Sequence, residues 1–373
     1  MGTFPSSIRP FIESRRKSFG SQFSVGSRGQ TVDQSTDLTV KKGKVTILDV
    51  AAAAGVSKST VSRILDERLP RSDSDTARRV RKVAEDLGYI RDVSAASLRR
   101  GSTSTVGVIV PRLTDTVMAM LYEAIGHACQ RAGQFAIVAT TEDKPDAGRE
   151  AAETLLNRGV DGLILSTSRL DDDFPSELHK RGVNFVLALR TDGKSRASVG
   201  DDQLGGYLAT RHLLDLGHRR IGLIAGPAYA SSAVQRLDGY RQAMAEFGAV
   251  IEPDWVVEST FGIDSGCTAA ERLMALANRP TAIFAVNDNT AIGALSALTR
   301  LGLSVPDDVS LVGYNDIPIV SRLPIPLTSV RVPFDQIASA ALELLASEGT
   351  QPDNGVRVAT PSLIPRRSTA TPG

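Results

Sequence analysis

The chain has 373 residues, of which 42% are hydrophobic and 23% are charged. This length accommodates two or three domains, and the composition is that of a globular protein, which excludes a disordered or membrane-embedded chain. The sequence contains no apolar run of about 18 residues, and its N-terminal stretch has no continuous apolar region. We therefore expect neither a membrane span nor a secretory signal.

The net charge of +1 is distributed unevenly. Residues 41–101 hold 14 Lys/Arg against 8 Asp/Glu, a net +6, and residues 1–40 hold 5 against 3, a net +2. The remaining residues must therefore carry 1 − 8 = −7. This asymmetry predicts a basic nucleic-acid-binding module ahead of an acidic body.

Cys129 and Cys267 are the only cysteines, and both lie in apolar helical patterns. This placement favours buried thiols in a reducing compartment over a disulfide or a metal site. The four histidines show no metal spacing, and we expect structural roles for His212 and His218. The sequence thus predicts a cytoplasmic protein with no metal, no cofactor and no catalytic residue.

Residues 1–44 are rich in Ser, Gly and Arg and show no sustained period, which predicts a disordered basic tail. A mis-assigned translation start would leave the same signature. The basic residues of such a tail could add weak, non-specific attraction to DNA.

The stretch TILDVAAAAGVSKSTVSRIL, residues 46–65, combines two short helical patterns joined at Gly55. Thr46 and Asp49 have the spacing of a capping box, and Ser57 can cap the second helix. That helix presents apolar residues for burial and keeps a polar, basic face. The arrangement is typical of a helix-turn-helix DNA reader, the alternative being an ordinary helical hairpin in a larger core.

A third helix is predicted over 75–89, with Ser72 and Asp75 at capping-box spacing and Gly88 at its end. Its apolar face consists of Val80, Val83, Ala84 and Leu87. It would close a small core and complete a DNA-binding domain over 45–90. A hinge or linker follows over 91–104.

From residue 105 to 366, continuous apolar strands alternate with amphipathic helices. We expect strands at 106–110, 135–139, 162–166, 184–189, 220–226, 282–286 and 309–313. The expected helices are 117–132, 147–158, 203–216, 233–247, 266–278 and 289–301. The pattern predicts an α/β body of two lobes, each a parallel sheet with helices on both faces, and a ligand at the carboxyl ends of the strands. A short tail, 367–373, would remain.

Motifs along most of the chain occur in the order found in one known family. They include the reader at 46–65, ASLRRGST at 96–103, RLDGY at 236–240, AVNDNTAIGAL at 285–295 and VSLVGYNDIP at 309–318. With these motifs the chain resembles the LacI-type family of bacterial transcription repressors from residue 45 to 366. The resemblance implies a homodimer that binds a pseudo-palindromic operator in double-stranded DNA. It also implies a body like a sugar-binding periplasmic protein, in which a small-molecule effector changes the affinity for DNA.

The resemblance places Lys58, Ser59 and Arg63 against base edges in the major groove. Arg63 could hold guanine O6 and N7 with two hydrogen bonds, whereas Thr60 and Ser62 suit phosphate contacts or capping. The expected DNA contacts are Thr46, Ser57, Lys58, Ser59, Thr60, Ser62, Arg63, Ala95, Leu98 and Arg99.

In the hinge, the resemblance makes Leu98 a wedge in the minor groove at the operator centre, one from each subunit. Leu98 packed on the body is the alternative. Asp92 replaces the usual Asn of the family and Arg91 a frequent Pro. An acidic Asp92 near phosphates should weaken DNA binding slightly or require Arg91 or Arg99 as a partner.

The expected effector contacts are Thr114, Asp115, Met118, Arg190, Ser232, Arg236, Asn287, Asn289, Asn315 and Asp316. Amide and carboxylate groups suit sugar hydroxyls, and Arg236 could donate two bonds to hydroxyls or a carboxylate. Asn287 or Asp288 could instead cap the following helix.

Two departures from the family bear on the effector. DTVM at 115–118 replaces an Asn-Pro-aromatic-aromatic run, and Leu189 replaces a frequent Asp. These changes remove an aromatic stacking surface and a carboxylate, both of which would help to bind an ordinary pyranose. They leave open an effector that is less hydroxylated or anionic, with Arg190 and Arg236 as anion partners.

Two other functions compete with a repressor. A transporter's solute-binding protein would need a signal peptide and no DNA reader. An enzyme on a Rossmann-like fold would need a phosphate-binding glycine motif, and GxGxxG does not follow the first strand. The absence of a leucine heptad after residue 366 predicts a dimer rather than a tetramer.

Overall fold

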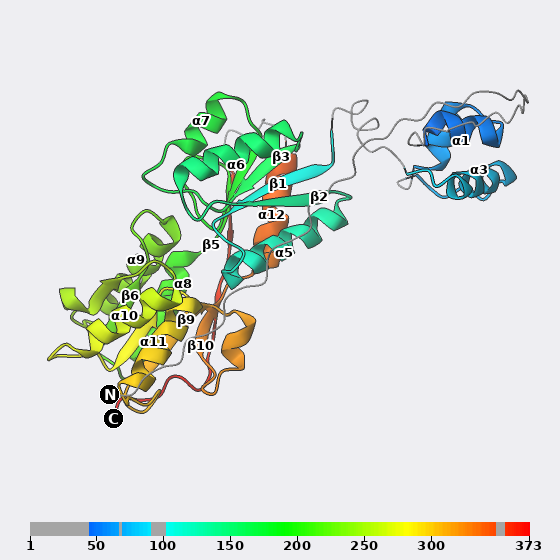
Figure 1. Ribbon diagram of the computed structural model, residues 1–373. Coiled ribbons are helices and arrows are strands. Elements are labelled where there is room, and N and C mark those ends of the chain that lie inside the picture. Colours follow the sequence, from blue (N-terminus) through cyan, green and yellow to red (C-terminus); the bar gives the residue numbers. More distant parts are fainter. Residues whose placement is uncertain (1–44, 67–68, 91–101, 348–354) are drawn as a thin grey trace, which may run out of the picture. The chain divides into compact units, whose positions relative to one another are not determined.

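The computed structural model describes residues 45–66, 69–90, 102–347 and 355–373 (Figure 1). The tail predicted for 1–44 and the hinge contacts predicted for Ala95, Leu98 and Arg99, with Arg91 and Asp92, lie outside these residues. The chain divides into two compact units, Met1–Arg91 and Asp92–Gly373.

Three helices form the described part of the first unit: α1 (Ile47–Ala54), α2 (Lys58–Ile64) and α3 (Asp75–Asp86). The predicted capping box is present, because the Asp49 Oδ2 accepts hydrogen bonds from the Thr46 N–H at 2.8 Å and the Thr46 hydroxyl at 2.7 Å. Gly55 adopts φ 65°, the left-handed conformation that a tight turn between two helices requires. The two helices of the predicted reader are therefore confirmed.

Two details of the third helix differ from the prediction. Ser74, not Ser72, caps α3, since its hydroxyl accepts the Ala77 N–H at 3.3 Å. Val80 and Ala84 are buried against α1 and α2, but Leu87 is 40% exposed. Leu87 is the C-cap residue, directly after the last helical residue Asp86, and its side chain is left partly open to solvent at the end of the helix.

The second unit consists of two lobes. Lobe 1 has an all-parallel sheet of order β11-β5-β4-β3-β1-β2. Its strands are β1 (Thr105–Val110), β2 (Phe135–Thr140), β3 (Gly162–Leu165), β4 (Phe185–Ala188), β5 (Ala197–Gly200) and β11 (Val356–Ala359). Its helices are α5 (Thr116–Arg131), α6 (Pro145–Asn157), α7 (Phe174–Lys180) and α12 (Phe334–Ala346).

Lobe 2 repeats this architecture with a sheet of order β12-β10-β9-β8-β6-β7, parallel except for the pairing of β12 with β10. Its strands are β6 (Ile221–Ala225), β7 (Val256–Glu258), β8 (Ala282–Ala285), β9 (Ser310–Asn315), β10 (Thr328–Arg331) and β12 (Ser362–Ile364). Its helices are α8 (Asp202–Asp215), α9 (Ser231–Glu246), α10 (Ile263–Met274) and α11 (Asp288–Arg300), with 3-10 turns η1 (Pro253–Trp255) and η2 (Pro318–Ser321).

The two-lobed α/β fold predicted from the strand-helix alternation is confirmed. The prediction missed α7, α12 and five strands of three or four residues, β5, β7, β10, β11 and β12. It also could not show that α12, drawn in orange in Figure 1, lies in lobe 1, where it packs against α5, β4 and β5. The chain passes between the lobes after β5, after β10 and after β11.

Glycines allow α8 and α9 to pack closely. A Cβ on Gly206 would overlap the Arg236 carbonyl oxygen, and one on Gly239 would overlap the Gln203 carbonyl oxygen. Only glycine permits two backbones to approach this closely. The contact places Asp202, at the start of α8, beside Arg236 on α9.

The segment predicted as a tail, 367–373, is instead bound to lobe 2. The buried Ser368 hydroxyl donates to the Leu311 carbonyl at 2.6 Å and accepts the Thr328 N–H at 2.8 Å. His218 is also buried there, with ring nitrogens 2.9 Å from the Thr281 hydroxyl and from the Ala370 carbonyl. Burial lowers the pKa of His218, which suits the predicted structural role.

Cys129 is buried as predicted, whereas Cys267 is only half-buried. Within the described ranges, no helix is both long and apolar enough to cross a membrane. No group of three or more His, Cys, Asp or Glu side chains among those residues could hold a metal ion.

Candidate functional site

The second helix of the first unit presents the residues predicted to read DNA. Val61 is buried against α1 and α3, while Lys58, Ser59 and Arg63 of α2 are exposed. At the start of α2, the Ser57 hydroxyl lies 2.8 Å from the Ser59 hydroxyl. The helix therefore offers two cations and a short polar side chain to a partner.

Other predicted DNA contacts are engaged within the domain. The Ser57 hydroxyl caps α2 by accepting the Thr60 N–H at 3.2 Å, and it lies 2.9 Å from the Thr60 hydroxyl. Ser62 is half-buried. Thr46 serves the capping box of α1. The hydroxyls of Thr46 and Ser57 stabilise the helix termini, whether or not they also meet phosphates.

The second unit holds a cleft between its lobes, with about 570 Å³ of empty space including open solvent. Its lining comes from the carboxyl ends of strands in both sheets, the loops after them and the N-terminal turns of α5 and α9, as the strand-end rule predicts. The lining residues are Pro111, Arg112, Asp115, Val117, Met118, Asp143, Leu189, Arg190, Ser232, Arg236, Thr260, Phe261, Asn287 and Asn315. Seven of the ten predicted effector contacts are among them, and Thr114, Asn289 and Asp316 are not.

Arg236 is the buried cation of lobe 2. Its Nε donates to the Asp202 Oδ1 at 2.8 Å, its Nη1 donates to the Val286 carbonyl at 2.7 Å, and its guanidinium carbon lies 3.7 Å from the centre of the Tyr314 ring. Burial raises the pKa of Asp202, although the positive charge of Arg236 opposes that rise. Arg236 thus reaches the cleft with its charge already paired inside the protein.

Arg190 is the buried cation of lobe 1. Its two terminal nitrogens donate to the two oxygens of Asp143 at 3.1 and 3.2 Å. Such a paired geometry is the strongest form of arginine–carboxylate contact. A bound anion would compete with Asp143 for Arg190, so neither arginine presents an unpaired charge to an effector.

Asp115 joins the lobes at another point of the cleft. Its Oδ1 caps α5 by accepting the Val117 N–H at 3.0 Å, and it accepts a bond from the Asn289 amide of lobe 2 at 3.1 Å. Burial raises the pKa of Asp115, with the two hydrogen bonds opposing the rise. Asn289 does not line the cleft itself, but its hydrogen bond positions Asp115, which does. Thr114 is exposed and lies outside the lining.

The predicted contact Asp316 has a different role. Its buried carboxylate is bound by Arg331 at 2.7 Å and by Arg366 at 2.6 Å. Both partners belong to lobe 2, and Asp316 does not line the cleft. We therefore assign it a structural role instead of the effector contact that the sequence suggested.

Asn287, not Asp288, caps helix α11. The Asn287 side chain accepts the Thr290 N–H at 2.8 Å and donates to the Phe261 carbonyl at 3.0 Å, yet the residue also lines the cleft. Asp288 is fully buried and does not cap, since its two oxygens accept from Ser329 and from the Ile317 N–H. Burial raises the pKa of Asp288 to about 7.

The sequence reasoning missed half of the cleft lining. Asp143 follows β2 and could have been found from the rule that sites form at strand ends. Phe261 could not, because it follows β7, a strand of three residues without a recognisable pattern. Phe261 gives the cleft an aromatic side chain, although the aromatic run of the family is missing at 115–118. The Arg190 guanidinium carbon lies 5.6 Å from the centre of the Phe261 ring.

Comparison with known proteins gives matches over both parts of the chain. Residues 46–92 match the model of the lacI family of bacterial regulatory proteins, and residues 210–369 match a periplasmic binding protein-like domain. The chain is 31% identical over 328 residues to the HTH-type transcriptional repressor PurR of Photobacterium profundum, covering 87% of this chain and 98% of that protein. It is 32% identical over 329 residues to the ribose operon repressor of Haemophilus influenzae, with coverage of 87% and 98%.

Solved structures of the same family also match the chain over most of its length. The lac repressor dimer bound to operator and the anti-inducer ONPF is 28% identical with a TM-score of 0.77, covering 88% of this chain and 100% of that one. The complex of the transcriptional regulator CelR with cellobiose is 30% identical with a TM-score of 0.67, covering 87% and 99%. The chain therefore belongs to the LacI family of bacterial transcriptional regulators, which are DNA-binding proteins and not enzymes.

Proposed function

We propose that this protein is a cytoplasmic repressor that binds a pseudo-palindromic operator as a homodimer and responds to a small molecule in the cleft. One observation carries the proposal: a single chain combines an exposed, basic helix-turn-helix face with a cleft that both lobes line with polar groups. A solute-binding protein would use the second feature and have no use for the first.

In this proposal, Lys58, Ser59 and Arg63 meet base edges in the major groove. Their exposure and their placement on one short helix support that role. Thr46, Ser57, Thr60 and Ser62 would contribute at most phosphate contacts. The minor-groove wedge at Leu98, with Ala95 and Arg99 beside it, belongs to the same proposal and rests on the family resemblance.

The effector would be a sugar or a related small metabolite bound between the lobes. Among similar proteins of known structure, the transcriptional regulator CelR is in complex with cellobiose, and a LacI family regulator from Enterococcus faecium has bound ribose. The paired state of Arg190 and Arg236 favours an uncharged effector over the anionic one that the sequence left open. Because the lobes close on the effector, it shifts DNA affinity by the difference in its affinity for the two lobe arrangements.

The DNA-binding part can be tested without knowing the operator. Purified protein would select sequences from a random duplex pool, and fluorescence anisotropy would measure affinity for the enriched site. Arg63→Ala should weaken binding by about 10- to 100-fold, since a bidentate guanine contact gives about 1–3 kcal/mol of discrimination. It should also relax the preference at one base position.

Arg78→Ala is the matched control. Arg78 lies on α3 and pairs with Asp75 within the same helix, so its loss removes one cation from the domain without touching α2. It should change affinity only modestly and equally for all sequences. Failure to enrich any sequence, or equal effects of the two substitutions, would contradict the proposal.

A thermal-shift screen of sugars, sugar acids and nucleosides tests the effector part. A ligand of the cleft stabilises the folded protein in proportion to the logarithm of its excess over Kd. We expect hits among uncharged compounds, and the hits should change operator affinity in the anisotropy assay. Stabilisation by sugar acids alone would contradict the preference for an uncharged effector.

A further inference from the structure

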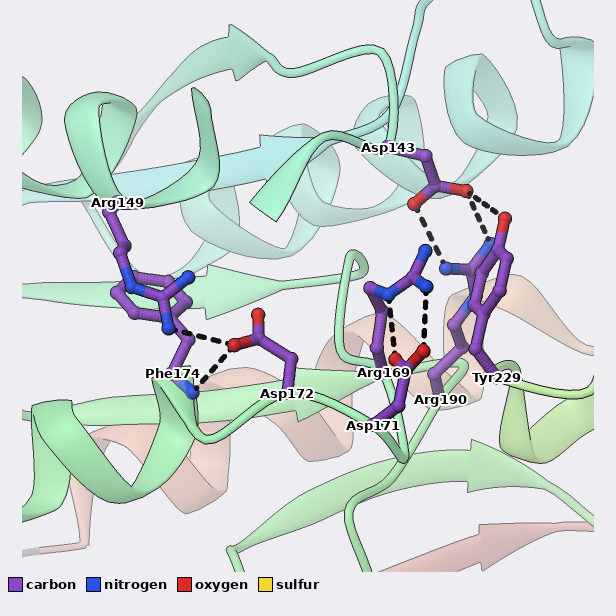
Figure 2. Close-up of polar contacts among 8 residues, drawn as sticks. All are labelled: Asp143, Arg149, Arg169, Asp171, Asp172, Phe174, Arg190 and Tyr229. Carbon is purple, nitrogen blue, oxygen red and sulfur yellow. Dashed lines mark hydrogen bonds and ion pairs between the residues drawn. The ribbon is translucent and has the colours of Figure 1, made fainter. Parts of the chain in front are cut away.

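Tyr229 connects the two lobes of the second unit. It lies in the loop between β6 and α9 of lobe 2, yet most of its polar and ring contacts are with lobe 1 (Figure 2). Its hydroxyl donates to the Asp143 Oδ2 at 3.1 Å, and the Arg169 guanidinium carbon lies 3.6 Å from the centre of its ring. The ring therefore meets residues from two separate loops of lobe 1.

The Arg169 guanidinium is held in place for this contact. Its Nε and Nη2 each donate to a different oxygen of Asp171 at 2.8 Å, as Figure 2 shows. The two bonds fix the plane of the guanidinium, and a cation stacked on an aromatic face at this distance is attractive. Asp171 thus orients the Arg169 guanidinium so that it stacks on the Tyr229 ring.

Asp143 links the same contact to the effector cleft. One carboxylate takes the two bonds of Arg190 and the bond of Tyr229, so a single side chain serves both lobes. Arg190 in turn lies 5.7 Å from the Tyr229 ring centre. If Tyr229 moved away, Asp143 would lose one of its partners, and the orientation of Arg190 in the cleft would be less restricted.

Two backbone amides complete the junction. The Leu170 N–H of lobe 1 donates to the Tyr229 carbonyl at 2.9 Å, and the Thr191 N–H of lobe 1 donates to the Ser231 hydroxyl at 2.8 Å. These bonds cross from one lobe to the other. Their exchange with solvent therefore reports directly on separation of the lobes at this point.

The chain passages between the lobes and the bond between Tyr229 and Asp143 lie toward opposite edges of the two sheets. The three chain passages between the lobes follow β5, β10 and β11, which lie at one edge of each sheet. Tyr229 follows β6 and Asp143 follows β2, toward the opposite edges of the two sheets. The passages can act as a hinge on one side, and the bond between Tyr229 and Asp143 lies toward the other, where opening produces the larger displacement. Arg169 and Arg190 follow the middle strands β3 and β4.

We propose that Arg169, Tyr229, Asp143 and Arg190 form a clasp that holds the lobes closed and thereby sets the response of the cleft to its effector. The clasp shifts the population toward the closed arrangement, in which Arg190 is oriented for binding. The regulatory consequence rests on the proposed function. The closure itself does not, because it can be measured without DNA or effector.

Lobe 1 provides a matched control for the clasp. Arg149, on α6, has its guanidinium carbon 5.2 Å from the centre of the Phe174 ring and pairs with Asp172 and Glu177 at 2.7 Å each. This cluster repeats the combination of arginine, aromatic ring and carboxylate, but all its members belong to lobe 1. Figure 2 shows Arg149 with Phe174 and Asp172. Its loss should leave the lobe junction intact.

The test is amide hydrogen exchange on the full-length protein, resolved at Leu170 and Thr191. Tyr229→Ala and Arg169→Ala should each accelerate exchange at both amides at least about tenfold, because the open arrangement becomes more populated. Tyr229→Phe keeps the stacked ring and should give a smaller acceleration. Arg149→Ala should give none. The Ser166 and Val286 amides, bonded within lobe 1 and lobe 2 respectively, should stay protected in every variant.

Unchanged protection at Leu170 and Thr191 in Tyr229→Ala and Arg169→Ala would overturn the clasp, as would equal acceleration by Arg149→Ala. If Tyr229→Ala does not fold, Tyr229→Phe and Arg169→Ala still decide the outcome. A protein that showed the clasp but selected no operator would contradict only the proposed function. The reverse result would contradict only the clasp.

Discussion

The two lobes each place one arginine–aspartate pair at the cleft, and the two pairs are held differently. Arg236 and Asp202 have 9% and 4% of their side chains exposed, and all their partners belong to lobe 2. Arg190 and Asp143 have 7% and 15% exposed, and Asp143 also bonds Tyr229 of the other lobe. The same two residue types thus build an interior support in one lobe and a junction between lobes in the other.

The difference follows from the surrounding backbone. Asp202 and Arg236 lie on two helices that glycines bring into contact, so neither can move away if its partner is lost. Asp143 lies in a loop, where it and Glu142 have positive φ values of 62° and 53°. A loop can relax where packed helices cannot. Disrupting the lobe 2 pair should therefore cost folding free energy, whereas disrupting the lobe 1 pair should mainly change closure.

The largest effect is expected for Asp202→Ala. It leaves the Arg236 guanidinium buried without its carboxylate, and breaking a buried pair in this way costs about 3–5 kcal/mol. The measurement is urea unfolding followed by fluorescence of Trp255, the single tryptophan of the chain, which is buried in lobe 2.

Asp238→Ala serves as the control for this substitution. Asp238 pairs with Arg241 on the exposed side of α9, where 47% and 58% of the two side chains are open to solvent. An exposed pair contributes about 1 kcal/mol or less. If the two variants unfolded at similar urea concentrations, the contrast between interior support and junction would be lost.

An intermediate effect is expected from Asp288, the other buried carboxyl of lobe 2. Its folded pKa of about 7 exceeds the ordinary value of 3.8, so between these pH values the native state binds a proton that the unfolded chain has released. Stability should therefore fall as pH rises from about 4 to about 7, and then level off.

Asp288→Asn isolates this dependence, because Asn keeps an acceptor for the Ile317 N–H and does not titrate. The half-buried His212 and the buried His218 have lowered pKa values and act in the opposite direction below about pH 6.5. The quantity to compare is therefore the difference in unfolding free energy between wild type and variant at each pH. A difference that does not change between pH 4 and 7 would show that Asp288 is charged throughout.

The smallest effect on stability is expected for Asp143→Asn. The amide keeps one acceptor for Arg190 and loses the charge, which should cost about 1 kcal/mol. That corresponds to a fall in the thermal midpoint of about 2–4 °C for a unit of this size. A loss as large as that of Asp202→Ala would mean that the lobe 1 pair is also an interior support.

Local patterns account for what was predicted correctly. Short continuous apolar runs such as VGVIV, bounded by turn residues, are typical of a strand buried on both faces, and the polar face of α2 follows from the spacing of its few apolar residues. The strands β5 (ASVG) and β7 (VVE) were missed because neither contains the continuous run of large apolar residues that marked the predicted strands. The cap at Ser74 was misplaced because several serines and aspartates near it have suitable spacings.

The sequence by itself determined the helix-turn-helix, the two-lobed α/β body and the edge of the sheets at which a ligand site forms, since each depends on periodicity within a short segment. Only the tertiary structure decided which side chains meet there. Arg190 is 47 positions from Asp143, and Asp143 is 86 from Tyr229. No local pattern encodes contacts between loops so far apart, because the packing of two whole lobes brings them together.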